Sequence, residues 1–199
     1  ISNGVVVVQD NRIVAVGKVG EVSIPADAQI IDVSGKTLTP GLIDGHAHGS
    51  QANEEIIPQQ NWKNLSSLAF GVTTIHDPSN DSSEIFAASE MQRSGQILGP
   101  RIFSTGTIIY GANSPTAHAK IDSYEDAFFH LQRLKDMGAV SVKSYNQPRR
   151  EQRQQVLNAA RDLELMVVPE GGGKLYQNMS MIADGHTTLE HSLNIATGY

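Results

Sequence analysis

From residue 42 onward, short apolar segments alternate with segments of helical periodicity, and this rhythm constrains the fold more than any other feature. Strands are expected at 42–46, 72–76, 101–104, 139–145, 165–170 and 187–191, with helices in most of the intervals. Strands that alternate with helices form right-handed βαβ units around a parallel sheet. A TIM barrel needs eight such units. The sequence therefore predicts an α/β fold, with the first six βα units of an incomplete (β/α)8 TIM-like barrel over residues 41–199.

Residues 1–40 have a different pattern. β-Branched runs at 4–8 and 12–16 flank a turn at Asp10 and Asn11, and a further strand is expected at 29–33. Pro40 and Gly41 mark the end of this part. The pattern predicts a small sheet unit that precedes the barrel.

The composition excludes several classes of protein. The net charge of -6 argues against a nucleic-acid or anionic-membrane partner, and no apolar run is long enough to span a membrane. Without cysteine, the chain can form no disulfide and offers no thiolate to a metal. The chain opens at Ile1 without a signal peptide, which suggests that upstream residues are missing. The compartment is unknown, and cytoplasmic is the default.

Two histidines form the most specific chemical motif. His46 and His48 follow an apolar strand and the Pro40–Gly41 turn. Side chains two residues apart on a strand share a face, and the carboxyl end of a barrel strand is the catalytic end. Imidazole is a good ligand for Zn²⁺. Two unrelated loop histidines would be the simpler explanation of a bare His-x-His, but this context favours a metal site.

The stretch from Ile31 through His48 resembles the entry signature of the amidohydrolase superfamily. Residues 1–40 resemble the N-terminal part of that superfamily's small β-sandwich. The later segments resemble its imidazolonepropionase-like and prolidase-like branch, which includes members fused to β-propellers. The resemblance covers the whole chain and implies a metal-dependent hydrolase. An extracytoplasmic location is possible if the chain is fused to a propeller.

Lys143 is the second candidate. Its neighbour Val142 is assigned to the helix-packed exterior of the barrel, so Lys143 points inward near the top. A buried lysine is costly unless it is paired, neutral or modified. The resemblance implies a lysine carbamylated by CO₂ that binds the metal. The alternative is a structural lysine paired with a carboxylate.

Two further candidates come from the resemblance. It implies that His191, at the end of the sixth strand, is a metal ligand; the alternative is a core histidine. Glu170 stands where the family usually has a histidine on strand five. A carboxylate can bind zinc or Mn²⁺, so Glu170 is a ligand, a substrate contact or the mark of a one-metal site. The family's general base is an aspartate on strand eight, which would lie in a missing C-terminal part.

Weaker candidates lie around this set. Tyr145 shares the face of Lys143 and could donate a hydrogen bond to a developing oxyanion. His118 ends a long polar loop, where a substrate contact is possible. His76 and Asp77 are rim residues that could shape the pocket, although loop polarity is the commoner explanation, and His186 is interpreted as structural.

The predicted function is hydrolysis of an amide or peptide-like C–N bond by metal-activated water, in a dipeptide, an N-acyl amino acid or a cyclic amide. One or two divalent ions are expected, zinc first, with manganese or iron as alternatives, together with CO₂ as the lysine carbamate. The other hypothesis is a non-catalytic or truncated homologue that binds metal or ligand without turnover. An open barrel exposes apolar edges, so a homo-oligomer or association with the missing C-terminal part is expected.

Overall fold

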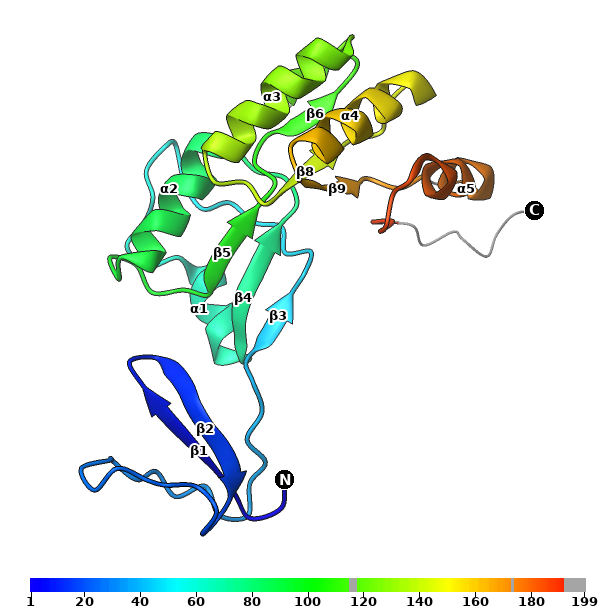
Figure 1. Cartoon of the computed structure of the whole chain (residues 1–199). Helices are drawn as coiled ribbons and strands as arrows, with labels where there is room; N and C mark the ends of the chain where they lie inside the picture. Colours follow the sequence, from blue (N-terminus) through cyan, green and yellow to red (C-terminus); the bar gives the residue numbers. More distant parts are fainter. Residues whose placement is uncertain (115–117, 173, 192–199) are drawn as a thin grey trace. The chain divides into compact units, whose positions relative to one another are not determined.

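The computed structural model describes residues 1–114, 118–172 and 174–191. The chain divides into two compact units, at residues 1–40 and from Gly41 onward. The first unit contains an antiparallel hairpin of β1 (Gly4–Gln9) and β2 (Arg12–Lys18) (Figure 1). Its turn residues Asp10 and Asn11 both have positive φ, as a tight hairpin turn requires. The prediction of a strand at 29–33 is wrong, because these residues pair with no strand in the described part of the chain.

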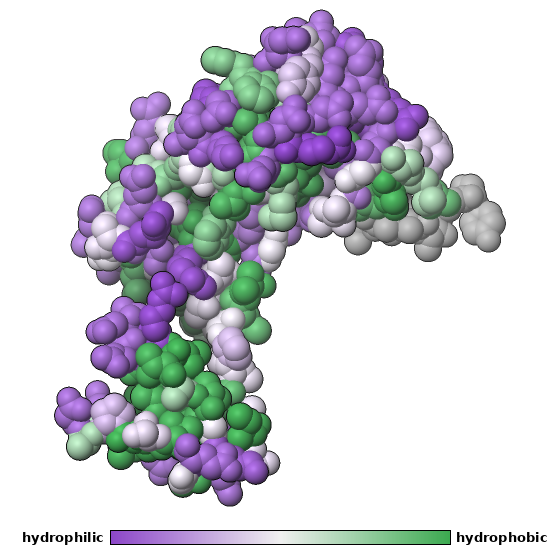
Figure 2. All heavy atoms as spheres, in the orientation of Figure 1, coloured by the Kyte–Doolittle hydropathy of each residue, from purple (hydrophilic) through white to green (hydrophobic). Residues whose placement is uncertain are grey.

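The hairpin leaves apolar side chains exposed. They lie on both of its strands, and Figure 2 shows them as a green area: Val6, Val8, Ile13, Val14 and Val16. A sheet of two strands has no second layer to cover its faces. Burial of these side chains would require additional protein.

The second unit begins with a parallel sheet in the order β3-β4-β5. Its strands are β3 (Leu42–Asp44), β4 (Val72–Asp77) and β5 (Arg101–Ser104). The helices α1 (Trp62–Ala69) and α2 (Ser82–Arg93) connect them. Each helix starts at a side-chain cap, because Asn61 accepts from the Lys63 backbone and Asp81 from that of Ser83.

A second parallel sheet has the order β7-β6-β8-β9. Its strands are β6 (Ile108–Tyr110), β7 (His118–Lys120), β8 (Ser141–Ser144) and β9 (Met166–Pro169). The chain bends after β5 at Gly106, whose φ of 64° is in the left-handed region, and β6 then pairs with β8. The short strands β6 and β7 were not predicted; they flank the polar loop that ends at His118.

The helices α3 (Tyr124–Asp136) and α4 (Arg150–Asp162) lie side by side against the second sheet, and α5 (Leu175–Asp184) follows β9 (Figure 1). Leu131, Leu134 and Val156 are fully buried, with Val142 of β8 beneath them. The predicted helical spacing is therefore confirmed. Parallel strands alternating with helices make this unit an incomplete (β/α)8 TIM-like barrel.

The strand predicted at 187–191 does not form. Residues 187–191 have no ladder partner in the described part of the chain, and His191 has a φ of 52°. A positive φ is incompatible with extended strand backbone. The strand at 42–46 is also shorter than predicted, since β3 ends at Asp44 and leaves His46 and His48 beyond it.

Charged side chains join α4 to α5. Asp184 accepts hydrogen bonds from Arg150 Nε at 2.8 Å and from Arg153 Nη2 at 2.9 Å. Burial alone would raise the pKa of Asp184, but the hydrogen bonds from Arg150, Arg153 and Gln154 lower it to about 2. Asp184 therefore stays ionised and holds the two helices together. None of the helices in the described residues combines the length and apolar character needed to cross a membrane.

His186, two residues after Asp184, gives the first testable prediction. It is 6% exposed, and neither ring nitrogen has a hydrogen-bond partner among the described residues. Burial, followed by the charge of Arg153, lowers its pKa from 6.5 to about 4, while Asp184 opposes the shift. As the pH falls from about 6.5 to about 4, the unfolded chain binds a proton that the folded chain does not. The free energy of unfolding should fall by up to about 3 kcal/mol over this window.

Urea unfolding across that pH range measures the effect. His186→Leu keeps a side chain of similar size without the titrating group, so its unfolding curve should depend less on pH between 6.5 and 4. An unchanged pH dependence in the variant would contradict the assignment.

Candidate metal centre

Three imidazoles converge beyond the carboxyl end of β3. The Nε2 atom of His46 lies 3.0 Å from Nε2 of His48 and 3.0 Å from Nε2 of His191. His46 and His191 are 145 positions apart in the sequence, so the fold brings them together. Potential ligand atoms of the three residues all lie within 4.8 Å of one another.

This arrangement fits a divalent metal ion. A tetrahedral zinc ion with Zn–N bonds of 2.0–2.1 Å separates its nitrogen ligands by about 3.3 Å. With His46 Nε2 3.0 Å from both other Nε2 atoms, the three nitrogens cannot all carry a proton without repulsion. A cation between them removes that conflict, because it takes up the three lone pairs. His46, His48 and His191 are therefore the residues that would hold the ion.

Neighbouring groups orient the imidazoles. Glu190 Oε2 lies 2.7 Å from Nδ1 of His46, and Ser79 Oγ lies 3.4 Å from Nδ1 of His48. Such partners at the outer nitrogen leave Nε2 free to bind a metal. Burial, and then the charge of His46, lower the pKa of His48, which favours its neutral, metal-binding form.

Lys143 and Glu170 lie beside the histidines. Lys143 is 1% exposed, and its Nζ lies 2.7 Å from Oε2 of Glu170. The other carboxylate oxygen of Glu170 lies 3.8 Å from Nε2 of His191. The predicted inward direction of Lys143 agrees with this burial. Glu170 is the carboxylate partner that the structural interpretation of Lys143 requires, and it also borders the histidine cluster.

Glycines after Glu170 allow this approach. Gly171 has a φ of 81°, and a Cβ atom there would collide with the carbonyl of Glu190. Gly172 exchanges two hydrogen bonds with the side chain of Asn178, at 2.8 and 3.0 Å. In the described residues, the absence of a side chain at Gly171 permits close contact with the segment that carries His191.

His76 and Asp77, at the end of β4, make more contacts near the histidine cluster than the sequence suggested. The His76 ring contacts the Gly45 carbonyl at 3.2 Å and the Ser141 hydroxyl at 2.7 Å. Asp77 is fully buried and accepts from the Ser79 backbone at 2.9 Å. Burial raises the pKa of Asp77, and its hydrogen bonds oppose this. Loop polarity was the commoner explanation of both residues, but the half-buried His76 contacts the segment before His46, and Asp77 is buried and hydrogen-bonded.

Glu190 was missed altogether. Its position next to His191 in the sequence was the available signal, but side chains of adjacent strand residues point to opposite faces. Because residues 187–191 are not a strand, the side chain of Glu190 can reach His46.

The two predicted substrate residues lie in a separate aromatic group. Tyr110 packs edge-on against Tyr145, with ring centroids 5.3 Å apart, and against His118 at 6.0 Å. The group joins β6, β7 and the end of β8. Residues 115–117 of the loop before His118 lie outside the described part of the chain. The substrate roles of Tyr145 and His118 stay predictions.

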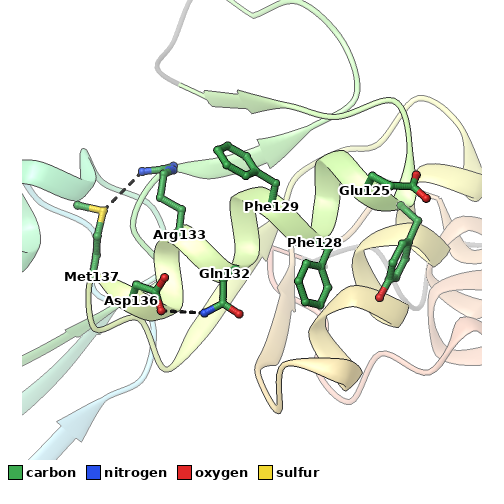
Figure 3. Close-up of a pocket in the computed structure, with 8 residues that line it drawn as sticks. Glu125, Phe128, Phe129, Gln132, Arg133, Asp136 and Met137 are labelled. Carbon is green, nitrogen blue, oxygen red and sulfur yellow. Dashed lines mark hydrogen bonds between the residues drawn. The ribbon is translucent and has the colours of Figure 1, made fainter.

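A groove elsewhere has no link to this chemistry. It lies on the outer face of α3, between the rings of Phe128 and Phe129 and beside Met137 (Figure 3). Gln132 donates to Asp136 at its edge, at 2.7 Å. None of the residues lining the groove belongs to the histidine cluster.

No family model matches the chain, but it is similar to several curated proteins and solved structures. It is 46% identical over 63 residues to imidazolonepropionase of Geobacillus sp. (strain WCH70), a match covering 27% of this chain and 15% of that protein. It is 25% identical over 180 residues to dihydroorotase of Geotalea daltonii, covering 85% of this chain and 39% of that protein. The chain thus spans less than half the length of these curated relatives.

Solved structures support the fold. An amidohydrolase crystal structure matches with a TM-score of 0.74 at 19% identity, over 96% of this chain and 56% of that one. A Xaa-Pro dipeptidase with methionine bound in its active site matches with a TM-score of 0.68 at 19% identity, over 94% of this chain and 56% of that one. Because nearly all of this chain aligns with about half of each structure, an incomplete barrel fits.

Proposed function

The chain belongs to the amidohydrolase superfamily, and on this premise we propose that the protein is a metal-dependent hydrolase of C–N bonds. The observation that carries the proposal is the convergence of three Nε2 atoms, from His46, His48 and His191, at spacings that suit one divalent ion. Zinc is the ion that an all-imidazole set favours, with manganese or iron as alternatives.

A bound ion would lower the pKa of a water ligand toward about 7 and polarise the scissile carbonyl. The protein's own groups would do the rest. Glu190 holds the His46 ring, and Ser79 contacts that of His48. Glu170 lies between His191 and Lys143. There its carboxylate can bind a second ion directly or hold a proton beside the Lys143 amine. Tyr145 would donate to the developing oxyanion, and His118 would contact the substrate.

The proposed substrate is a dipeptide, an N-acyl amino acid or a cyclic amide. A dipeptidase among the similar structures supports the first of these. The aromatic group of Tyr110, Tyr145 and His118 offers one apolar surface for a substrate side chain. Hydrolysis assays with a panel of dipeptides and N-acyl amino acids would test the substrate class.

Metal analysis tests the proposal itself. The purified protein is expected to contain zinc or a similar ion, to lose it to a chelator and to regain it on reconstitution. Because metal binds only the folded site, zinc at a hundred times its dissociation constant should raise the free energy of unfolding by about 2.7 kcal/mol. A protein that carries no metal and takes up none after chelation would overturn the proposal.

One observation favours a second candidate, a homologue that binds metal without turnover. Lys143 and Glu170 neutralise each other at 2.7 Å, which withdraws both from catalysis as long as the lysine is unmodified. The two candidates differ in a simple assay. Metal uptake with hydrolysis of any member of the panel supports the enzyme, whereas metal uptake without hydrolysis supports the binding protein.

A further inference from the structure

The proposed site is assembled from two different sheets. His46 and His48 follow β3, which belongs to the sheet β3-β4-β5. Lys143 on β8 and Glu170 after β9 belong to the sheet β7-β6-β8-β9. Metal ligands must be held within a few tenths of an ångström of the right geometry. Something must therefore fix the histidine segment against the strand that carries Lys143.

His76 contacts the histidine segment twice. Its backbone carbonyl accepts from the amide of Ala47, the residue between the two histidines, at 2.9 Å. Its ring Nδ1 contacts the carbonyl of Gly45 at 3.2 Å, immediately before His46. A carbonyl only accepts, so Nδ1 carries the proton and donates it. His46 thus lies between two points at which the chain is bound to His76.

The same ring reaches the other sheet. Because Nδ1 holds the proton, Nε2 accepts from the hydroxyl of Ser141, at 2.7 Å. Ser141 is fully buried on β8, two residues before Lys143 and on the same face. A single imidazole therefore connects the segment of the two histidines with the strand of the lysine.

We propose that His76 is a positioning residue, which sets the place of His46 and His48 relative to Lys143 and thereby the affinity of the site for metal. The proposal rests on the proposed function, because it presumes that the three histidines bind an ion. His76 itself is not a ligand: the cluster of potential ligand atoms in the described residues consists of His46, His48 and His191.

Zinc affinity, measured in the full protein by competition with a chelator, tests the proposal. His76→Phe keeps a ring but removes both side-chain contacts, and zinc affinity should fall about 10- to 100-fold, the usual effect of losing a partner behind a ligand. His76→Asn keeps a donor for the Gly45 carbonyl, but its side chain is too short to place an acceptor where Nε2 meets the Ser141 hydroxyl. His76→Asn and Ser141→Ala should each weaken binding, and the double variant should be no worse than the poorer single one, since both remove the same bond.

Thr74→Val is the matched control. Thr74 is buried two residues earlier on β4, and its hydroxyl accepts from Arg101 at 3.1 Å within one sheet. Its loss should lower the unfolding midpoint of the metal-free protein but change zinc affinity by less than about twofold.

The outcomes separate the two proposals. Normal zinc affinity in His76→Phe, or an equal loss in Thr74→Val, would overturn the role of His76 while leaving the metal site intact. Failure of the unaltered protein to bind zinc would overturn both.

Discussion

Replacing His46 with alanine is expected to abolish hydrolysis and to weaken zinc binding by roughly 10²- to 10³-fold. His46 is the central member of the cluster, because its Nε2 lies 3.0 Å from the Nε2 atoms of both other histidines. Structural zinc sites bind with about 10–16 kcal/mol shared among four ligands, so each ligand contributes about 2.5–4 kcal/mol. At about 1.4 kcal/mol for each factor of ten, that loss gives the expected range.

The measurement combines zinc affinity by chelator competition with a hydrolysis assay on the substrate panel. His130→Ala is the control, since His130 is a half-buried histidine on α3 outside the cluster. It should keep its zinc and its activity. If His46→Ala bound zinc as tightly as the unaltered protein, the three-histidine site would be wrong.

The alternation of strands and helices could be predicted from the sequence because each element's periodicity is a pattern of residues that are close in the chain. Leu131 and Leu134 are buried on one face of α3, as their spacing requires, and Val142 packs beneath the helices. The strand at 187–191 failed for the opposite reason: its apolar pattern is local, but a strand forms only where a ladder partner is available. The left-handed backbone of His191 then breaks the extension.

The candidate site was predictable only in part. His46 and His48 are two residues apart, so the sequence could pair them in one site, although strand alternation is not the reason because both lie beyond the end of β3. The interactions of Glu190 with His46, and of His76 with Ser141, join segments 144 and 65 positions apart. Neither pair has a local pattern, because the distance between them is set by how the elements pack. Glu170 was partly predictable. Its position at the end of β9 followed from the sequence, but its ion pair with Lys143 depends on how the two strands lie in the folded chain.

Metal reconstitution of the stripped protein is expected to depend on CO₂. As an ammonium, Lys143 cannot bind a metal, and its Nζ lies 2.7 Å from the Glu170 carboxylate. To form a carbamate, the ammonium first releases one proton to solvent. The neutral amine then forms a bond to the carbon of CO₂, one C–O electron pair moves onto oxygen, and the nitrogen releases a second proton. Glu170 is placed to accept that proton, and the resulting anion can bind metal.

Reconstitution with zinc in buffer with bicarbonate and in buffer freed of CO₂ measures this dependence. Without CO₂ the site lacks one anionic ligand, so zinc binding should be weaker by roughly 10²-fold. Isotopically labelled bicarbonate should give a carbonyl signal that Lys143→Met lacks. Equal binding in both buffers would mean that Lys143 is a structural lysine.

Zinc binding by a variant whose stability is restored then distinguishes a structural lysine from a ligand. Breaking a buried ion pair from one side leaves an uncompensated charge, which costs about 3–5 kcal/mol. In the metal-free protein, Lys143→Met should lower the free energy of unfolding by about that amount. Adding Glu170→Leu removes the stranded carboxylate, so the double variant should regain most of the loss. If the pair is only structural, the double variant should also bind zinc normally; if Lys143 is carbamylated, stability should return while CO₂-dependent zinc binding stays lost.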